Sequence, residues 1–153
     1  MKVEEVMNGT VYACKPTDSL RFAAQLMWDH DIGCVAVIDD NGRAVGMVTD
    51  RDLLMCSLLN DRPLPNEQVA QAMSKELHSV RLGESIITAE KLMQGKQVRR
   101  LAVIGPEGRL AGIISLNDLA LAAGKKREVR PEDVVATLAS ICQPRPTSAT
   151  ARG

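Results

Sequence analysis

Aromatic residues are nearly absent from this chain of 153 residues, in which Tyr12, Phe22 and Trp28 are the only three. Proteins that stack single-stranded nucleic acid need several aromatic side chains, so the sequence excludes a platform of that kind. Neither sign of charge is in excess, because 19 Lys and Arg residues balance 19 Asp and Glu residues. A nucleic-acid partner held by a strongly basic surface is therefore not expected.

Long apolar runs are also missing. No run approaches the roughly 20 residues that cross a bilayer, and the initial Met-Lys-Val-Glu-Glu lacks the apolar core of a signal peptide. We therefore expect a cytoplasmic protein without a membrane partner.

Patterns of metal ligands and catalytic residues are absent as well. Cys14, Cys34, Cys56 and Cys142 form no C-x-x-C pair, and the sequence has only two histidines. A zinc site needs ligands that converge at short spacing, so we predict reduced, buried thiols and no metal. No nucleophile and base stand in a catalytic pattern, so no catalytic residue and no enzyme activity are predicted.

One segment of the chain occurs twice, with a constant shift of 66 residues that aligns residues 6–53 with residues 72–119 without a gap. The identical pairs are Met7/Met73, Ser19/Ser85, Ala23/Ala89, Leu26/Leu92, Met27/Met93, Ala36/Ala102, Val37/Val103, Ile38/Ile104, Gly42/Gly108, Arg43/Arg109, Gly46/Gly112, Asp52/Asp118 and Leu53/Leu119. Most other pairs exchange similar residues. The sequence thus indicates a tandem duplication, in which two small repeats share one core.

Each repeat has the predicted order strand, helix, strand, strand, helix. In the first repeat the strands are expected at 11–14, 34–38 and 44–48, and the helices at 19–29 and 50–59. Asn41-Gly42 predicts a hairpin turn between the last two strands. Pro63 and Pro65 predict a linker after the repeat, and Asn66 is expected to cap a short helix. A last helix is expected at 132–142, with Pro131 in its first turn.

The two repeats share a motif in which a strand ends in a hydroxyl residue and leads into a helix opened by an aspartate. The two copies are Gly46-Met47-Val48-Thr49-Asp50-Arg51-Asp52 and Gly112-Ile113-Ile114-Ser115-Leu116-Asn117-Asp118. Free N–H groups at a helix start and a hydroxyl suit phosphate oxygens, and a carboxylate suits ribose hydroxyls. The same spacing is also an ordinary capping box, so a purely structural role of these residues stays open.

With this element order and these motifs, the chain resembles tandem CBS domains, the paired unit called a Bateman module, of the small stand-alone type. The resemblance covers residues 3 to about 122 and includes Arg99-Arg100-Leu101-Ala102-Val103, which is similar to the second strand of the family. It implies an α+β fold of two tandem CBS repeats, each β-α-β-β-α, packed as a pseudo-twofold pair. We expect the first repeat at 1–60, the second at 66–124, a C-terminal helical extension at 125–142 and a disordered tail at 143–153.

The resemblance further implies a regulatory or sensor module that binds an adenosine-type nucleotide (AMP, ADP, ATP or S-adenosylmethionine) in clefts between the repeats and signals to an effector protein. The nucleotide is a regulatory ligand, and no cofactor is required. The ligand-binding residues carried over by position are Ala13, Cys34, Ala36, Met47, Thr49, Asp52, Ser79, Arg99, Arg100, Ala102, Ile113, Ser115 and Asp118. Ala13 and Ser79 stand where the first strand of the family often has a threonine that contacts the ligand.

Each cleft is expected to combine both repeats. Thr49 and Asp52 then share one cleft with Ser79, Arg99 and Arg100. Ser115 and Asp118 share the other with Ala13, Gly33 and Cys34, where the matching strand offers no cation. We therefore expect a polyphosphate to fill the Thr49/Asp52 cleft first.

A second reading of the same fold remains open, in which the protein is a dimerising interaction scaffold whose clefts are empty or filled by side chains. In both readings Met27, Trp28 and Met93 on the first helices of the repeats predict a homodimer, because a lone small module cannot easily hide that apolar surface. Its interface is expected at these helices or at the helices that follow Asp52 and Asp118.

Overall fold

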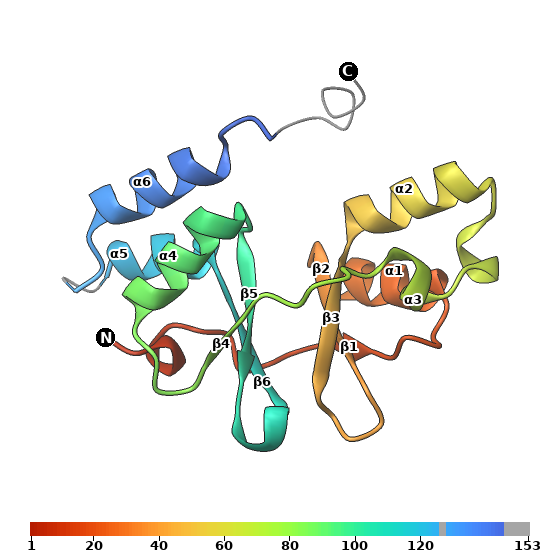
Figure 1. Ribbon diagram of the computed structural model, residues 1–153, viewed down its shortest axis with the longest axis horizontal. Helices are drawn as coiled ribbons and strands as arrows, with labels where there is room; N and C mark the ends of the chain where they lie inside the picture. The colour runs from red at the N-terminus through yellow and green to blue at the C-terminus, as the bar shows by residue number, and fades with distance from the viewer. Residues whose placement is uncertain (126–127, 146–153) are drawn as a thin grey trace.

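Two three-stranded sheets stand side by side at the centre of the molecule, and the helices lie to either side of them (Figure 1). The computed structural model describes residues 1–125 and 128–145. Its strands are β1 (Ala13–Cys14), β2 (Cys34–Ile38), β3 (Ala44–Thr49), β4 (Ser79–Arg81), β5 (Arg100–Ile104) and β6 (Leu110–Ser115). Its α-helices are α1 (Leu20–Asp29), α2 (Asp50–Asn60), α3 (Val69–Ala72), α4 (Ile86–Lys96), α5 (Leu116–Ala123) and α6 (Pro131–Ile141). Short 3₁₀ turns are η1 (Val3–Glu5), η2 (Leu64–Asn66) and η3 (Pro106–Gly108).

The two sheets have the same topology, which confirms the predicted α+β fold of two tandem repeats. In each sheet the first strand pairs with the second in parallel, and the second pairs with the third in antiparallel fashion. The registers are equivalent, since Ala13 faces Ala36 in one sheet and Ser79 faces Ala102 in the other. The repeats therefore form the expected pseudo-twofold pair.

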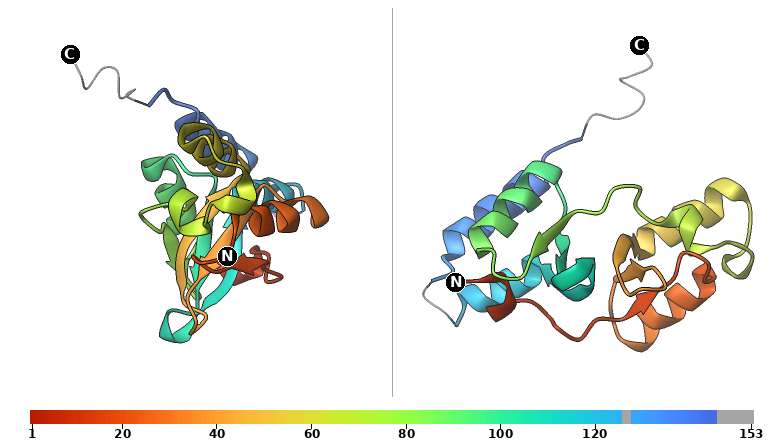
Figure 2. Two further views of the ribbon diagram at one scale, coloured as in Figure 1. Left: turned by 90° about the vertical axis from the view of Figure 1, so that its right-hand side faces the viewer. Right: turned by 60° about the horizontal axis from the view of Figure 1, so that its bottom comes forward.

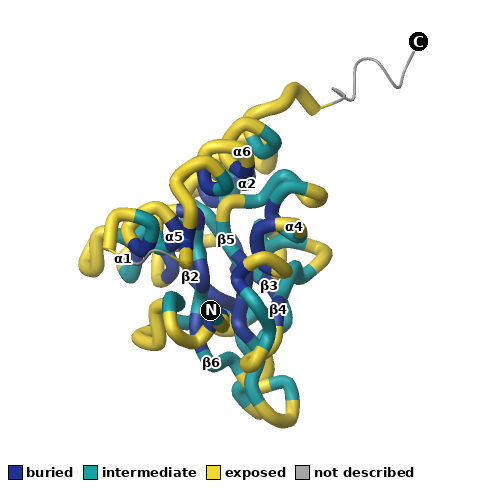
Figure 3. Tube along the Cα trace, turned by 90° about the vertical axis from the view of Figure 1, so that its left-hand side faces the viewer, coloured by how far each residue is buried: buried dark blue, intermediate teal, exposed yellow. Residues whose placement is uncertain are grey.

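The core follows the apolar pattern of the sequence. Buried residues concentrate on the strands and on the helix faces that cover them (Figure 3). On α1, Leu20, Ala23 and Met27 are buried, and their spacing of three and four residues places them on one face. Ser19 begins this helix, because its side chain accepts a hydrogen bond from the backbone N–H of Phe22.

The repeats exchange their N-terminal segments. Val3 is fully buried in the core of the second repeat, and the backbone of Asn8 pairs with Ile113 of β6 through bonds of 2.9 and 3.0 Å. In the same way, the backbone N–H of Ser74 donates to the carbonyl oxygen of Met47 in β3 at 2.8 Å. The third strand of each repeat thus pairs with the N-terminal segment of the other repeat. The two segments occupy equivalent positions.

Gly46 and Gly112 permit this exchange. A Cβ atom on Gly112 would lie 2.7 Å from Met7 Sδ and 2.9 Å from the carbonyl oxygen of Asn8. A Cβ atom on Gly46 would lie 3.3 Å from the carbonyl oxygen of Ser74. The glycines shared by both repeats therefore mark the two places where the segments cross at close range.

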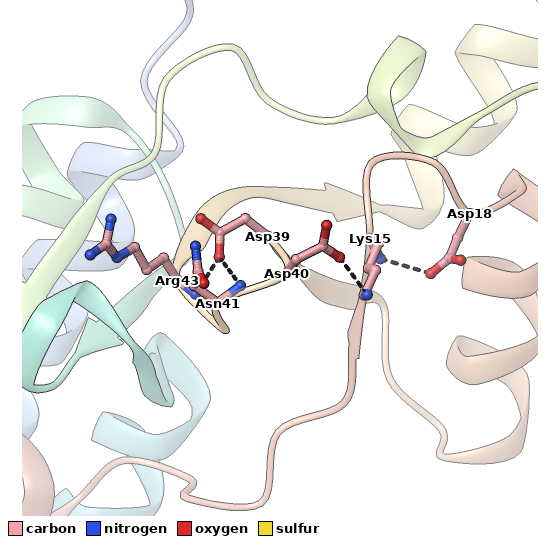
Figure 4. A network of polar contacts seen from close by, with 6 residues as sticks. All are labelled: Lys15, Asp18, Asp39, Asp40, Asn41 and Arg43. Atoms are coloured by element: carbon pink, nitrogen blue, oxygen red, sulfur yellow. Dashed lines mark hydrogen bonds and ion pairs between the residues drawn. The ribbon is translucent and has the colours of Figure 1, made fainter.

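The Asn41-Gly42 hairpin turn is present as predicted, and it is held by side chains (Figure 4). Asp39 Oδ1 accepts hydrogen bonds from the backbone N–H groups of Asn41 and Arg43, at 2.8 and 2.9 Å. Gly42 has a φ of 77°, which glycine adopts without strain. Lys15 forms an ion pair of 2.6 Å with Asp40, which ties the turn to the end of β1.

Several boundaries differ from the predicted ones. The first strand contains only Ala13 and Cys14, because only these two residues pair with β2, and Val11 and Tyr12 precede it and line a cleft. Asn66 does not cap a helix; it ends η2, and Gln68 caps α3.

The C-terminal part departs from the sequence-based picture in other ways. Cys142 is exposed, not buried, because it follows the last turn of α6. Residues 143–145 are described and belong to no helix or strand, whereas 146–153, the rest of the predicted disordered tail, lie outside the described residues.

The predicted C-terminal helix packs on the second repeat. Pro131 is its first residue, as expected, and α6 runs beside α4 and also contacts α5 (Figures 1 and 2). Among the helices of residues 1–125 and 128–145, none is long and apolar enough to cross a membrane.

Candidate ligand-binding clefts

Two clefts lie between the repeats. Cleft one has a volume of about 470 Å³ and is lined by Cys34, Met47, Thr49, Asp52, Ser74, His78, Gln97, Val98, Arg99, Arg100, Ile141, Cys142 and Arg145. Cleft two has a volume of about 250 Å³ and is lined by Asn8, Thr10, Val11, Tyr12, Asp31, Ile32, Gly33, Cys34, Arg100, Ile113, Ser115, Asn117 and Asp118. Each cleft takes its helix start from one repeat, and from the other repeat it takes the residue before the first strand and the start of the second strand.

The shift of 66 residues also relates the two linings. The equivalent pairs are Asn8/Ser74, Tyr12/His78, Asp31/Gln97, Ile32/Val98, Gly33/Arg99, Cys34/Arg100, Met47/Ile113, Thr49/Ser115 and Asp52/Asp118. These parts of the clefts are therefore pseudo-twofold copies of one site, and they differ in the residues that fill equivalent places.

In cleft one, Thr49 and Asp52 form a reciprocal capping box at the start of α2. Thr49 Oγ1 accepts a hydrogen bond from the backbone N–H of Asp52 at 3.2 Å, and Asp52 Oδ2 accepts one from the backbone N–H of Thr49 at 2.9 Å. The hydroxyl proton of Thr49 and the second carboxylate oxygen of Asp52 have no partner in the part of the chain that the structure describes. Both atoms remain available to a ligand.

The first-turn N–H groups of α2 are already engaged. The backbone N–H of Asp52 donates to Thr49. The backbone N–H of Asp50 donates to the carbonyl oxygen of Gly33 at 3.3 Å, and that of Arg51 donates to the Asp50 side chain at 2.8 Å. Free backbone N–H groups were expected here to bind phosphate. In the structure these N–H groups are therefore not free to bind a ligand.

In cleft two, the equivalent capping box is more tightly closed. Asp118 Oδ2 accepts hydrogen bonds from both the backbone N–H and the hydroxyl of Ser115, at 2.7 and 2.6 Å. The Ser115 hydroxyl thus donates its hydrogen bond to Asp118, whereas the Thr49 hydroxyl donates none to Asp52. Ser115 offers a ligand one donor fewer than Thr49.

The arginines are arranged differently from the expectation. Arg99 lines cleft one, but Arg100 lines both clefts, so cleft two does contain a cation. Arg100 reaches cleft two beside Gly33, where a Cβ atom would lie 3.7 Å from a terminal guanidinium nitrogen of Arg100 and 3.1 Å from Asp50 Oδ2. The sequence alone did not show that β5 begins close to the pseudo-twofold axis.

Cys34 also lies between the clefts and lines both. Burial raises the pKa of its thiol to about 11, while Arg100 lowers this pKa and Asp52 and Asp50 raise it. The thiol is therefore neutral at pH 7 and contributes an apolar surface, not a nucleophile.

Four of the residues proposed from the sequence do not line a cleft: Ala13, Ala36, Ser79 and Ala102. Ala36 and Ala102 are fully buried in the middle strands. In place of Ala13 and Ser79, the preceding residues Tyr12 and His78 face the clefts. Neighbouring residues of extended chain point to opposite sides, so an error of one residue in register exchanges the two.

Sequence reasoning also missed one wall of cleft one. Ile141, Cys142 and Arg145, from the end of α6 and the segment after it, line this cleft. The repeat pattern ends before this segment, so nothing in the sequence related it to a cleft. Within residues 1–125 and 128–145, no cluster of three or more His, Cys, Asp or Glu side chains is placed to hold a metal ion.

Comparison with known proteins gives matches over most of the chain. The family model of the CBS domain matches residues 3–58 and 69–125. Hypoxic response protein 1 of Mycobacterium tuberculosis is 33% identical over 141 residues, which cover 92% of this chain and 93% of that protein. Homoserine O-acetyltransferase of Methanocorpusculum labreanum is 28% identical over 79% of this chain, which covers only 24% of the enzyme.

Solved structures share the fold. The CBS domain protein TA0289 of Thermoplasma acidophilum superimposes with a TM-score of 0.77 at 22% identity, over 92% of this chain and 75% of that one. CBSX2, solved in complex with AMP, superimposes with a TM-score of 0.73 at 27% identity, over 82% of this chain and 98% of that one.

Proposed function

This chain belongs to the CBS domain family, and on this premise we propose that it is a regulatory module that binds an adenosine-type nucleotide in the clefts between its repeats and signals the change to an effector protein. The observation that carries the proposal is the pair of equivalent clefts, each with a helix-start hydroxyl and a carboxylate, and with Arg100 between them. The AMP complex of CBSX2, a protein of the same fold, supports an adenine nucleotide as the ligand.

In cleft one, we assign roles to four of the polar side chains. The free carboxylate oxygen of Asp52 accepts from the ribose hydroxyls, and the Thr49 hydroxyl donates to a phosphate oxygen. Arg99 and Arg100 supply guanidinium groups that fit phosphate oxygens in pairs. In cleft two, Arg100 is the phosphate donor and the second carboxylate oxygen of Asp118 accepts from the ribose hydroxyls, whereas the Ser115 hydroxyl donates to Asp118 and is not assigned to the phosphate.

The assembly we propose is a homodimer that covers the α1–α2 groove of the first repeat. This groove has a volume of about 570 Å³ and is lined by Ala24, Met27, Trp28, Asp31, Ile32, Asp50, Leu53, Leu54, Ser57 and Leu64. Trp28 is 84% exposed and Leu54 is 66% exposed. An apolar face of this kind on a small domain is typical of a protein interface.

The second repeat supports this assignment. Gln94 and Gln97 stand at the places equivalent to Trp28 and Asp31, and both bond to α6 or to the segment after it. A helix of the chain itself therefore covers in the second repeat the groove that is open in the first. The open groove needs an equivalent cover, and in a homodimer the helical face of the second copy supplies it.

The scaffold function remains the second candidate, because the capping boxes favour it. Thr49, Asp52, Ser115 and Asp118 would be needed for helix starts even if no nucleotide bound.

A thermal-shift panel of AMP, ADP, ATP, S-adenosylmethionine and NADH separates the two functions. A ligand present at 100 times its dissociation constant adds about 2.7 kcal/mol to the free energy of unfolding. The sensor function predicts a saturable rise in melting temperature with at least one adenosine nucleotide. No rise with any of them would leave the scaffold function.

A further inference from the structure

The C-terminal extension contributes to cleft one. Gln94 Nε2 donates to the Thr137 hydroxyl at 2.8 Å, and Thr137 is fully buried between α6 and α4. Gln97, itself a residue of cleft one, donates to the carbonyl oxygens of Ser140 and Gln143 at 3.3 and 2.8 Å. These bonds fix the end of α6 and the following residues at the edge of the cleft, so that Ile141, Cys142 and Arg145 line it.

Arg145 is held at the cleft by one main-chain acceptor. Its guanidinium group donates to the carbonyl oxygen of Gln97, which is its only acceptor in the described ranges 1–125 and 128–145. A guanidinium group has five N–H donors in a planar fork. The bond to Gln97 therefore positions the guanidinium group of Arg145, and most of its N–H donors remain free for a ligand.

The charges of the two clefts differ in sign. Cleft one has three arginines, Arg99, Arg100 and Arg145, against the single carboxylate of Asp52. Cleft two has Arg100 alone against Asp31 and Asp118. The structure therefore attracts a highly charged anion to cleft one and disfavours it in cleft two.

The volumes point the same way. Cleft one, at about 470 Å³, lies within the range of roughly 300–1,000 Å³ typical of small-molecule sites, whereas cleft two, at about 250 Å³, lies below it.

We propose that cleft one is a site for an adenosine di- or triphosphate, and that Arg145, in the segment that follows α6, binds its terminal phosphate. This inference rests on the proposed nucleotide-binding function and specifies the ligand of that cleft. Thr49, Arg99 and Arg100 bind the inner part of the phosphate chain, and Arg145 binds the outer part from its place beside Gln97. A monophosphate leaves Arg145 on the Gln97 carbonyl oxygen.

Binding and the position of α6 are then linked. A ligand that contacts both Arg145 and the helix start of α2 stabilises the arrangement in which the C-terminal extension covers the cleft. The position of the C-terminal extension thereby depends on the number of phosphates of the bound nucleotide.

Titration calorimetry of AMP and ADP tests the inference, with wild type, Arg145→Ala and the control Arg109→Ala. Arg109 is an exposed arginine on the β5–β6 turn that lines neither cleft. We expect ADP to bind wild type and the control more tightly than AMP. Arg145→Ala should weaken ADP about tenfold and leave AMP unchanged, as the loss of one charge-assisted contact predicts.

An unchanged ratio of ADP to AMP affinity in Arg145→Ala would overturn the role of Arg145 and leave the proposed function intact. If neither nucleotide binds the wild type, the proposed function fails as well. Arg145 is exposed and lies after the last helix, so the variant is expected to fold normally.

Discussion

At the scale of single residues, Glu67 and Glu90 are the two buried carboxylates within residues 1–125 and 128–145, and Glu90 is buried at a cost. Glu90 on α4 is only 6% exposed, and its Oε1 atom has no hydrogen-bond partner among residues 1–125 and 128–145. Burial raises the pKa of Glu90, and Asp133 raises it further, while Arg130 lowers it. The raised pKa means that the folded state holds this proton more tightly than the unfolded state does.

Glu90 therefore weakens the fold as the pH rises. The destabilising effect of Glu90 grows as the pH rises from its ordinary pKa of 4.5 to its raised pKa in the folded protein. The full loss of folding free energy applies at neutral pH. We predict that Glu90→Gln is more stable than wild type at pH 7 and that the difference shrinks toward pH 4. Urea unfolding of both proteins at several pH values measures it. A difference that does not change with pH would show that the charge of Glu90 is not the cause.

Part of the cleft lining could be predicted from the sequence, whereas Ala13, Ala36, Ser79 and Ala102 do not line a cleft and the wall formed by the end of α6 was missed. The hydroxyl and carboxylate pairs are recognisable because their spacing is local, and both pairs lie in the clefts. Tyr12 and His78 were missed in favour of Ala13 and Ser79, since the side to which an extended residue points depends on a register that the sequence leaves open. The sharing of Arg100 depends on packing between the sheets, which no local pattern encodes.

At the scale of elements, the exchange of N-terminal segments depends on two glycines. Gly112→Ala would bring a Cβ atom within 2.7 Å of Met7 Sδ and 2.9 Å of a carbonyl oxygen, so the segment before the first repeat must move away from β6. We predict a loss of about 1–3 kcal/mol in the free energy of unfolding, as for an overpacked core site. Chemical denaturation gives this quantity.

Gly9→Ala is the matched control, because a Cβ atom there meets nothing within 4 Å. Its stability should stay the same or rise slightly, since alanine restricts the unfolded chain. Equal losses in the two variants would argue against a close crossing at Gly112.

The elements themselves followed from the sequence better than their packing did. The Asn41-Gly42 turn and the helix that begins after Ser19 are set by residues within a few positions, so their signals are local. The exchanged segments and the contact of α6 with α4 join residues far apart in the chain. The sequence identifies the apolar faces of these segments and of α6, but it does not show which surface each face covers.

At the scale of the whole molecule, the proposed homodimer makes the α1–α2 groove an interface. We predict that Leu54→Glu yields a monomer, because a carboxylate would be buried without a partner. Val135→Glu, at a similarly exposed position on α6, should remain a dimer. Light scattering at tens of micromolar distinguishes the two. A wild-type monomer would refute the homodimer, and a dimer lost only in Val135→Glu would place the interface on the second repeat.

The central claim is that an adenosine nucleotide binds between the repeats and that cleft one is the stronger site. Titration calorimetry of AMP into wild type, Asp52→Asn and Asp118→Asn tests it most directly. Asparagine keeps an acceptor for the capping N–H group but loses the charge that holds the ribose hydroxyls. We expect saturable binding to wild type, a tighter site weakened about tenfold by Asp52→Asn, and the same tighter site intact in Asp118→Asn. Equal affinity in all three proteins, or no saturable binding to wild type, would contradict it.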